Sequence, residues 1–258
     1  MALELITGLG ENTHAICEAI ARQLSAELGE TVTWNNASTW DELQARLQRG
    51  DVQMGWICGL LYTMLKPVVN YQPLCAPLFD TQTQPIYFAN LIVHRDSAIH
   101  DWEGLRGARW VINETSSYSG YHGLLAHLAR HGESLHYFSQ VVASGTHAHS
   151  AQWVADGRAD VASLDHSVYD YLLVHQPHLM EQVRVIQRLA LHTAPPWIVH
   201  PDLPPATRQA VRSVLLHMPP QAPTQGGVRQ WVTIDDHDYD PLRHVYQDSK
   251  RLSEGDRA

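Results

Sequence analysis

The chain has 258 residues, 44% of them hydrophobic and 17% charged, which is the composition of an ordinary soluble globular protein. Its net charge of −9 argues against nucleic acid or an acidic membrane surface as a partner. A local group of backbone dipoles still allows an anionic small ligand. No apolar run is long enough to span a bilayer, so we expect no membrane-inserted segment.

The reactive side chains predict neither a metal nor a cofactor. The cysteines are odd in number and lack C-x-x-C spacing, so they are expected as free thiols: Cys17, Cys58 and Cys75. His147 and His149 could together chelate a metal, but a pair with this spacing is more often incidental. No export signal precedes the first apolar segment. The compartment is therefore cytoplasmic if Met1 is the true start, and periplasmic if a signal lies outside this chain.

The first part of the chain alternates strands with helices. Strands are expected at 3–7, 31–34 and 51–57, with helices beginning near residues 12, 38 and 60. Ser38 is the expected cap of the second helix, which turns Trp40 inward. This β-α-β-α-β-α order predicts a doubly wound, mainly parallel sheet. Residues 67–85 contain four prolines and are expected to form a loop.

The second part repeats this architecture without a detectable sequence repeat. Strands are expected at 87–94, 110–112, 135–143, 160–164, 183–191 and 197–199. Helices are expected near 102–105, from Gly120, through 151–155, behind Asp165, at 203–218 and at the end of the segment 235–252. The chain is thus an α/β protein with two α/β halves.

The stretch ARWVINETSSYSGYHGLLA, residues 108–126, contains a strand, a hydroxyl-rich turn and a helix. The first backbone N–H groups of such a helix lack internal partners, and the helix dipole adds positive charge there, so the turn suits an anion. Ser117 and Ser119 can donate further hydrogen bonds, and Gly120 lets the backbone come close. The alternative is that one of these serines only caps the helix.

Four expected strand ends carry polar side chains just before a helix: Cys58 with Gly59, residues 117–119, residues 144–147, and Asp165. Ligands of parallel sheets gather beyond the carboxyl ends of the strands. A cleft between two lobes would bring these four segments together.

These segments also carry a family resemblance. The SYSGY turn resembles the S-x-S-G-[YF] turn of the phosphonate, phosphite and phosphate substrate-binding proteins of ABC importers. SGTHAHSAQWVADGRADVASLD is similar to the same family's SG-x-H…V-x-x-G-x-x-DVA…D segment, and DVQMGWICGLLY to its strand-turn-helix with G-x-x-Y. TIDDHDYDPLRHV resembles the D-x-D-Y-x-P-[LI] ending of the family. The resemblance covers nearly the whole chain in the same order.

The resemblance implies a type II periplasmic-binding-protein fold. In such a fold two doubly wound α/β lobes are joined by two crossover segments and close on a ligand in the cleft between them. The crossovers are expected near 82–88 and 190–196. Lobe 1 then comprises residues 1–86 plus 194–258, and lobe 2 comprises residues 87–193.

The resemblance also implies the binding residues. In lobe 2, Ser117, Tyr118, Ser119 and Gly120 would hold the oxyanion, His147 would donate a further hydrogen bond, Asp165 would face the variable part of the ligand, and Tyr87 would lie just past the first crossover. In lobe 1, the implied residues are Trp40, Cys58, Gly59 and Tyr62.

Two departures from the family pattern stand out. Tyr118 replaces a small threonine in the turn, and Leu61 stands where a proline is frequent. For several residues a structural role stays open beside the binding role. Cys58 fits a small buried hydrophobe, His147 a helix-start residue, Trp40 a core residue, and Asp165 a helix cap.

The sequence therefore predicts a binding protein without catalytic residues that closes on a small anionic ligand such as phosphate, phosphite or a phosphonate. The resemblance adds an ABC permease as a partner. The alternative is a cytoplasmic enzyme on the same fold, in which Asp165, His147 or Cys58 would act as acid, base or nucleophile, or a ligand sensor acting on a signalling protein.

Overall fold

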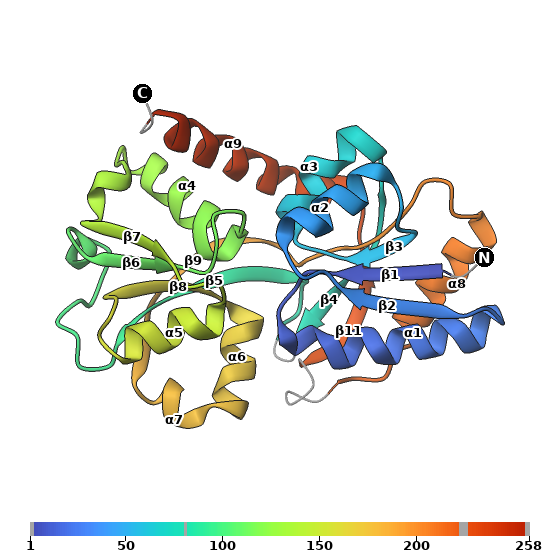
Figure 1. Ribbon diagram of the computed structural model, residues 1–258, viewed down its shortest axis with the longest axis horizontal. Coiled ribbons are helices and arrows are strands. Elements are labelled where there is room, and N and C mark those ends of the chain that lie inside the picture. The colour runs from blue at the N-terminus through green and yellow to red at the C-terminus, as the bar shows by residue number, and fades with distance from the viewer. Residues whose placement is uncertain (1–2, 80–81, 222–226, 256–258) are drawn as a thin grey trace. The chain divides into compact units, whose positions relative to one another are not determined.

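The computed structural model describes residues 3–79, 82–221 and 227–255 (Figure 1). The chain divides into two compact units, the first made of Met1–Ile86 and Thr193–Leu242, the second of Tyr87–His192 and Arg243–Ala258. Each unit is built on one β-sheet with helices around it. The expected α/β class with two lobes is confirmed. Within the described ranges, no helix combines the length and hydropathy needed to cross a bilayer.

The first unit contains a six-stranded sheet in the order β11-β4-β10-β3-β1-β2. Its strands are β1 (Leu3–Thr7), β2 (Val32–Asn36), β3 (Met54–Trp56), β4 (Gln72–Phe79), β10 (Trp197–Val199) and β11 (Val228–Thr233). The strands β2, β1 and β3 are parallel, as expected, whereas β10 runs antiparallel to both β3 and β4. The late strands β10 and β11 therefore complete a sheet that the first strands begin.

Helices cover both faces of this sheet: α1 (His14–Leu28), α2 (Trp40–Arg49), α3 (Gly59–Val69) and α8 (Pro205–Leu216). In Figure 1, α1 and α8 lie on one side of the strands and α2 and α3 on the other; each pair is in contact. Short helical turns precede α1 and α9, η1 (Glu11–Thr13) and η6 (Asp236–Tyr239). The cap of α2 is Thr39 rather than Ser38, because the Thr39 side chain accepts the N–H of Glu42 at 3.1 Å.

The prediction of a loop at 67–85 is wrong. Gln72–Phe79 forms β4, which lies between β10 and β11 and is buried from its second residue onward. Pro73 and Pro77 each remove one N–H from the ladder, and the pairing with β10 shifts register beside Pro73. Burial of the apolar residues between the two prolines outweighs the lost hydrogen bonds. The prolines therefore mark a local irregularity in a strand and do not end it.

The second unit contains a five-stranded sheet in the order β7-β6-β8-β5-β9. Its strands are β5 (Ile86–His94), β6 (Arg109–Ile112), β7 (Gln140–Ala143), β8 (Val161–Asp165) and β9 (Val183–Thr193). Its helical segments are η2 (Glu103–Leu105), η3 (Tyr118–His122), α4 (Gly123–Arg130), η4 (Leu135–Tyr137), α5 (His147–Ala155), α6 (His166–His175), α7 (Pro177–Met180) and most of α9 (Asp240–Gly255). The expected strand at 135–143 is shorter, because Ser134 caps the short helix η4 at its start.

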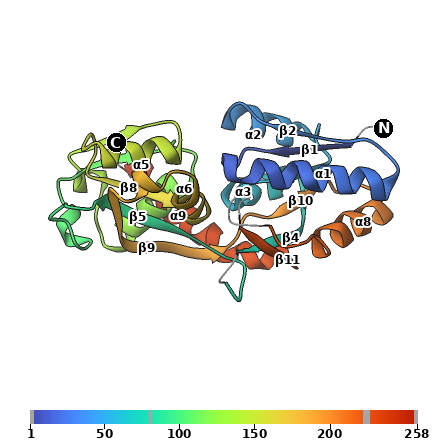
Figure 2. The same ribbon diagram turned by 90° about the horizontal axis from the view of Figure 1, so that it is seen from below.

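Side chains alternate between the two faces of this sheet and form a core on each face. Trp110 and Ile112 of β6 pack with Leu124 and Leu128 of α4 on one face, and Val111 between them belongs to the core on the other face. The strands β6, β7 and β8 are parallel, so their carboxyl ends meet at one edge. β5 runs antiparallel to β8, which brings its first residues to that same edge. Figure 2 shows the long strand β5 and, beside it, the edge strand β9 of this sheet.

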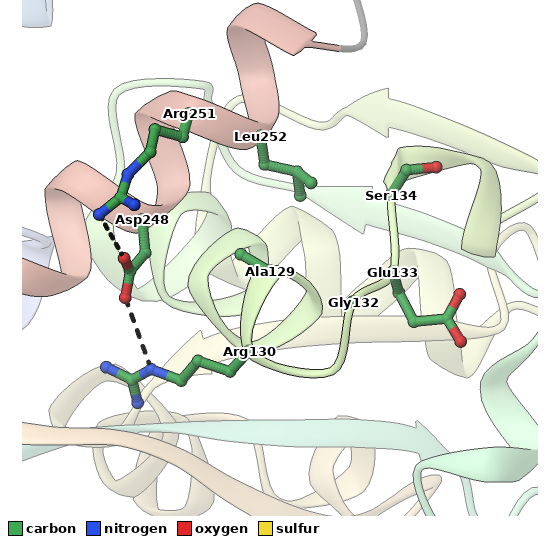
Figure 3. Close-up of a pocket in the computed structure, with 8 residues that line it drawn as sticks. All are labelled: Ala129, Arg130, Gly132, Glu133, Ser134, Asp248, Arg251 and Leu252. Atoms are coloured by element: carbon green, nitrogen blue, oxygen red, sulfur yellow. Dashed lines mark hydrogen bonds and ion pairs between the residues drawn. The ribbon is translucent and has the colours of Figure 1, made fainter.

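The C-terminal residues 243–258 belong to the second unit, whereas the sequence places them in the first lobe. Leu252 of α9 packs against the α4 side of the core. Asp248 lies 3.8 Å from Nε of Arg130 on α4 and 3.1 Å from Arg251 on its own helix (Figure 3). α9 is amphipathic, and the partner of its apolar face is a tertiary contact that local sequence does not specify.

Candidate anion-binding site

The serine-containing turn of the second unit follows β6 and begins the helix. Ser117 is extended, and its Oγ accepts the N–H of Gly120 at 3.1 Å, so Ser117 is the N-cap. Tyr118–His122 then form a π-helical turn, η3, that continues into α4. Short π-turns of this kind frequently mark functional sites. We call residues 117–120 the serine turn.

The serine turn is packed too closely to admit a larger residue at its glycine. A Cβ on Gly120 would overlap the amide oxygen of Asn113, would lie 2.9 Å from Cγ of that residue, and would lie 3.1 Å from the Ser117 hydroxyl. Asn113 Oδ1 is buried and accepts no hydrogen bond from the described residues. Glycine is therefore required here for close approach of the backbone.

Two neighbouring segments hold Ser119. The Ser163 hydroxyl on β8 donates a hydrogen bond to the Ser119 carbonyl oxygen, which ties the turn to the sheet. The Ser119 hydroxyl lies 3.2 Å from Nε2 of His147. Ser119 is only 2% exposed, so the contact with His147 sets the orientation of its hydroxyl.

His147 is the first residue of α5, a helix capped by Thr146, whose side chain accepts the N–H of His149. Burial lowers the pKa of the His147 imidazole, while the charge of Asp165 and a backbone hydrogen bond with Ser163 offset part of that shift. The ring is therefore neutral at pH 7. Sequence left open a binding or a helix-start role for His147; it occupies the helix start and also contacts the Ser119 hydroxyl.

Asp165 ends β8 and is the N-cap of α6. Its Oδ1 accepts the N–H and the hydroxyl of Ser167, each at 2.7 Å, and its Oδ2 accepts the Tyr87 hydroxyl at 2.8 Å. Asp165 therefore has the helix-capping role that the sequence left open, and it also binds the Tyr87 hydroxyl.

Several effects act on the ionisation of Asp165. Burial alone would raise its pKa, but the charges of His166 and His147 and the hydrogen bonds from Ser167 and Tyr87 outweigh burial and lower it. The hydrogen bonds act at every pH, whereas the histidine charges act only in acid. Asp165 is therefore a carboxylate at neutral pH, with 13% of its side chain exposed.

Aromatic rings support the serine turn from the side of β5 and β9. Tyr118 is 1% exposed and packs edge-to-face on His192, with 4.2 Å between ring centroids. The ring centroid of Tyr87 lies 5.1 Å from that of His192 and 5.3 Å from that of His166. The tyrosine that replaces a small threonine in the turn is therefore accommodated inside the second unit.

The sequence did not predict three residues that contact the site: Ser163, His166 and His192. Ser163 and His192 lie on strands, and His166 begins a helix next to Asp165. Ser163 and His166 lie in the run SLDH, where polar residues at the end of an apolar strand could have indicated a site. His192 had no local signal, because β9 reaches the turn only through the sheet.

The remaining expected residues lie in the first unit. Cys58 is the N-cap of α3 and makes no side-chain cap hydrogen bond. Gly59 faces Leu242, since a Cβ there would lie 2.9 Å from that leucine. The buried Tyr62 donates its hydroxyl hydrogen to Asp236. Trp40 is half-buried on α2, and its indole N–H donates to Gln44 of the same helix at 3.1 Å.

The expected residues therefore fall into two groups, one in each unit. The second unit brings Ser117, Tyr118, Ser119, Gly120, His147, Asp165 and Tyr87 to one edge of its sheet, joined by the contacts described above. The donors there are hydroxyls, backbone amides and imidazoles. Among the residues described by the structure, no three His, Cys, Asp or Glu side chains gather as a metal site.

Comparison with known proteins adds a family and a set of similar folds. A family model described as "ABC transporter, phosphonate, periplasmic substrate-binding protein" matches residues 9–239. A binding protein component of an ABC phosphonate transporter from Pseudomonas aeruginosa is similar with a TM-score of 0.84 and 17% identity, covering 98% of this chain and 87% of that one.

Two further solved structures are similar. PhnD1 from Prochlorococcus marinus, in complex with methylphosphonate, has a TM-score of 0.83 and 14% identity, covering 97% of this chain and 99% of that one. A Xanthomonas citri protein bound to ATP has a TM-score of 0.75 and 19% identity, covering 98% of each chain. At these identities the solved structures show a shared fold.

Proposed function

The chain belongs to the family of periplasmic substrate-binding proteins of phosphonate ABC transporters, and we propose that its serine turn binds the phosphorus oxyanion of the transported ligand. The match to this family is the reason that a transport role is favoured over the enzyme and sensor alternatives. We further propose that the protein releases its ligand unchanged to an ABC permease.

The contact between Ser119 and His147 is the observation that carries this proposal. A phosphonate or phosphate group presents three or more oxygens and needs several donors that converge from different directions. If Nε2–H of the His147 ring donates to the Ser119 oxygen at 3.2 Å, the Ser119 O–H hydrogen is left for a ligand oxygen, next to the N–H groups of the helix start at η3. The turn binds an anion without a basic side chain in its own segment.

Ser117 can take part as well as cap the helix. Its oxygen accepts the Gly120 N–H, and its own O–H hydrogen stays available to a ligand oxygen. The capping role and the binding role, which the sequence set against each other, are therefore compatible in one hydroxyl.

The ligand class we propose is phosphate, phosphite or a small phosphonate, with methylphosphonate as the first probe. PhnD1, one of the proteins of similar fold, was solved with methylphosphonate. Asp165 lies near His147 and carries a negative charge, which disfavours a second anionic group on the ligand at that side. This favours ligands with a single oxyanion and a neutral or cationic remainder.

Isothermal titration with phosphate, phosphite, methylphosphonate, aminoethylphosphonate and sulfate tests the proposal. Ser119→Ala should weaken binding of the best ligand by about tenfold to a hundredfold, since it removes a hydrogen bond to a charged group. Ser116→Ala is the matched control, because Ser116 lies just before the turn and outside it. Equal affinities for the two variants would refute the role of the turn, and affinity for none of the phosphorus oxyanions would refute the ligand class.

A further inference from the structure

Two arginines on α8, Arg208 and Arg212, have no acidic partner among the described residues. They lie four residues apart, and the structure shows neither an ion pair nor a side-chain hydrogen bond for either of them. The Nε atoms of both are buried, and neither has a hydrogen-bond partner in the described part of the chain. Other arginines of the chain are paired with carboxylates: Arg46 with Glu4, Arg106 with Glu133, and Arg109 with Asp160.

The two arginines line a cavity of about 250 Å³ in the first unit. The cavity lies between α8 and the start of β4, with Gln209 beside the arginines and Gln72 and Pro73 on the strand. Its volume suits one small ion with a few water molecules. The amide side chains add neutral hydrogen-bonding groups to the two cationic ones.

This arrangement is unfavourable as long as the cavity holds only water. Like charges at i and i+4 on a helix repel each other, and Arg208 and Arg212 have this spacing on α8. Buried N–H donors without acceptors add a desolvation cost. In a chain of net charge −9, a nearby carboxylate could have neutralised the pair, yet no carboxylate of the described residues does so.

We propose that this cavity is a second anion site, which takes a compact tetrahedral oxyanion of the size of inorganic phosphate or sulfate. A guanidinium presents parallel N–H donors that match two oxygens of such an ion, so two arginines one helical turn apart can hold it from two sides. The site is separate from the serine turn, which belongs to the second unit. Its occupancy stabilises α8 against the sheet of the first unit.

Titration of the arginine Nε–Hε resonances tests this site directly. We would use ¹⁵N-labelled protein carrying Ser117→Ala/Ser119→Ala, so that the serine turn does not compete, and add sodium phosphate or, at equal ionic strength, sodium chloride. Two resonances, assigned by their loss in Arg208→Gln/Arg212→Gln, should shift saturably with phosphate, and the double glutamine substitution should weaken phosphate binding at least tenfold. Arg22, whose side chain is 72% exposed on α1, is the control and should respond to both salts alike.

Two results would overturn the proposal. The first is a response of the Arg208 and Arg212 resonances that is no different from that of Arg22. The second is a fall in Tm of several degrees for Arg208→Gln/Arg212→Gln in chloride, because repelling charges kept only for an anion should cost nothing when removed. Failure of the serine turn to bind phosphonate would show in the affinity of Ser119→Ala and leaves this test unaffected.

Discussion

Gly120 is the residue of the serine turn whose replacement the structure constrains most. A methyl group there would meet the Asn113 amide and the Ser117 hydroxyl, which caps the start of η3. Gly120→Ala should destabilise the protein by about 1–3 kcal/mol, as overpacking of a buried site does, and weaken methylphosphonate binding. Thermal unfolding and ligand titration measure both effects. Gly104→Ala is the control, because a Cβ at Gly104 would have its nearest atoms at 3.4 Å, an ordinary contact distance. Equal effects of the two substitutions would contradict the packing argument.

His147 should take up protons when an anion binds. Burial lowers its pKa in the free protein, and an anion beside Nε2 raises the pKa in the complex, so protonation and binding favour each other. Affinity should therefore rise as the pH falls below 7. Titrating methylphosphonate at pH 7 in two buffers of different ionisation enthalpy measures this uptake. Protonation of the ligand itself contributes equally in His147→Gln, which lacks only the imidazole. Its proton uptake should therefore be smaller than that of the unmodified protein. An unchanged uptake would exclude His147 as the group that takes up the proton.

Residues of the serine turn could be predicted from sequence because a strand, a turn and a helix follow one another within twenty residues. Ser117, Ser119 and Gly120 are read from that local pattern alone. Ser163 and His192 contact the turn only because the sheet order places β8 and β9 near β6 and β5. No local pattern contains that order.

Among the elements, α9 is coupled to the serine turn through one buried contact. Ser249 is 0% exposed, and its hydroxyl lies 3.0 Å from Nδ1 of His122, the last residue of η3. The His122 ring also packs edge-to-face on Tyr246 at 5.5 Å. The C-terminal helix thus fixes the far end of the π-turn whose near end is Ser117.

Ser249→Ala should lower the stability of the second unit and weaken methylphosphonate binding. The substitution leaves a buried imidazole nitrogen without its partner, which costs about 1–3 kcal/mol. Gln247→Ala is the matched control, because Gln247 is exposed on the same helix. Tm values and titrations of both variants check the expectation. If Ser249→Ala lowered Tm but left affinity at the level of Gln247→Ala, α9 would support the fold without positioning the turn.

Element prediction failed where packing outweighs local signals. The prolines of β4 predict a loop, but burial between β10 and β11 keeps those residues in a strand. α9 was predicted as a helix from its periodicity, and its amphipathic character left its partner undetermined. Periodicity specifies which face of an element is apolar, and the tertiary fold specifies what covers that face.

For the whole molecule, buried histidines predict a loss of stability in mild acid. Burial lowers the pKa of His122 to about 4 and that of His127 to about 4. The unfolded chain then binds more protons than the folded chain below pH 6.5, so the free energy of unfolding falls as the pH drops from about 6.5 toward 4. For His122 the loss amounts to roughly 3 kcal/mol. The lowered pKa of Asp165 adds to the loss only at still lower pH.

Tm measured at pH 7 and pH 4.5 checks this expectation. His122→Gln should show a smaller drop in Tm between the two pH values than the unmodified protein. His178→Gln is the control, since the side chain of His178 is 97% exposed and its loss should leave the drop unchanged. A drop that is the same in all three proteins would assign the acid sensitivity to other groups.

A crystal structure of the protein with methylphosphonate shows whether a phosphorus oxyanion binds at the serine turn. We expect the phosphonate oxygens at hydrogen-bond distance, roughly 2.7–3.2 Å, from the Ser119 hydroxyl and from the backbone N–H groups at the start of η3. We also expect His147 to remain beside Ser119 and to face the anion. A phosphonate bound away from residues 117–120, with the Ser119 hydroxyl still bonded only to His147, would show that the serine turn is not the binding site.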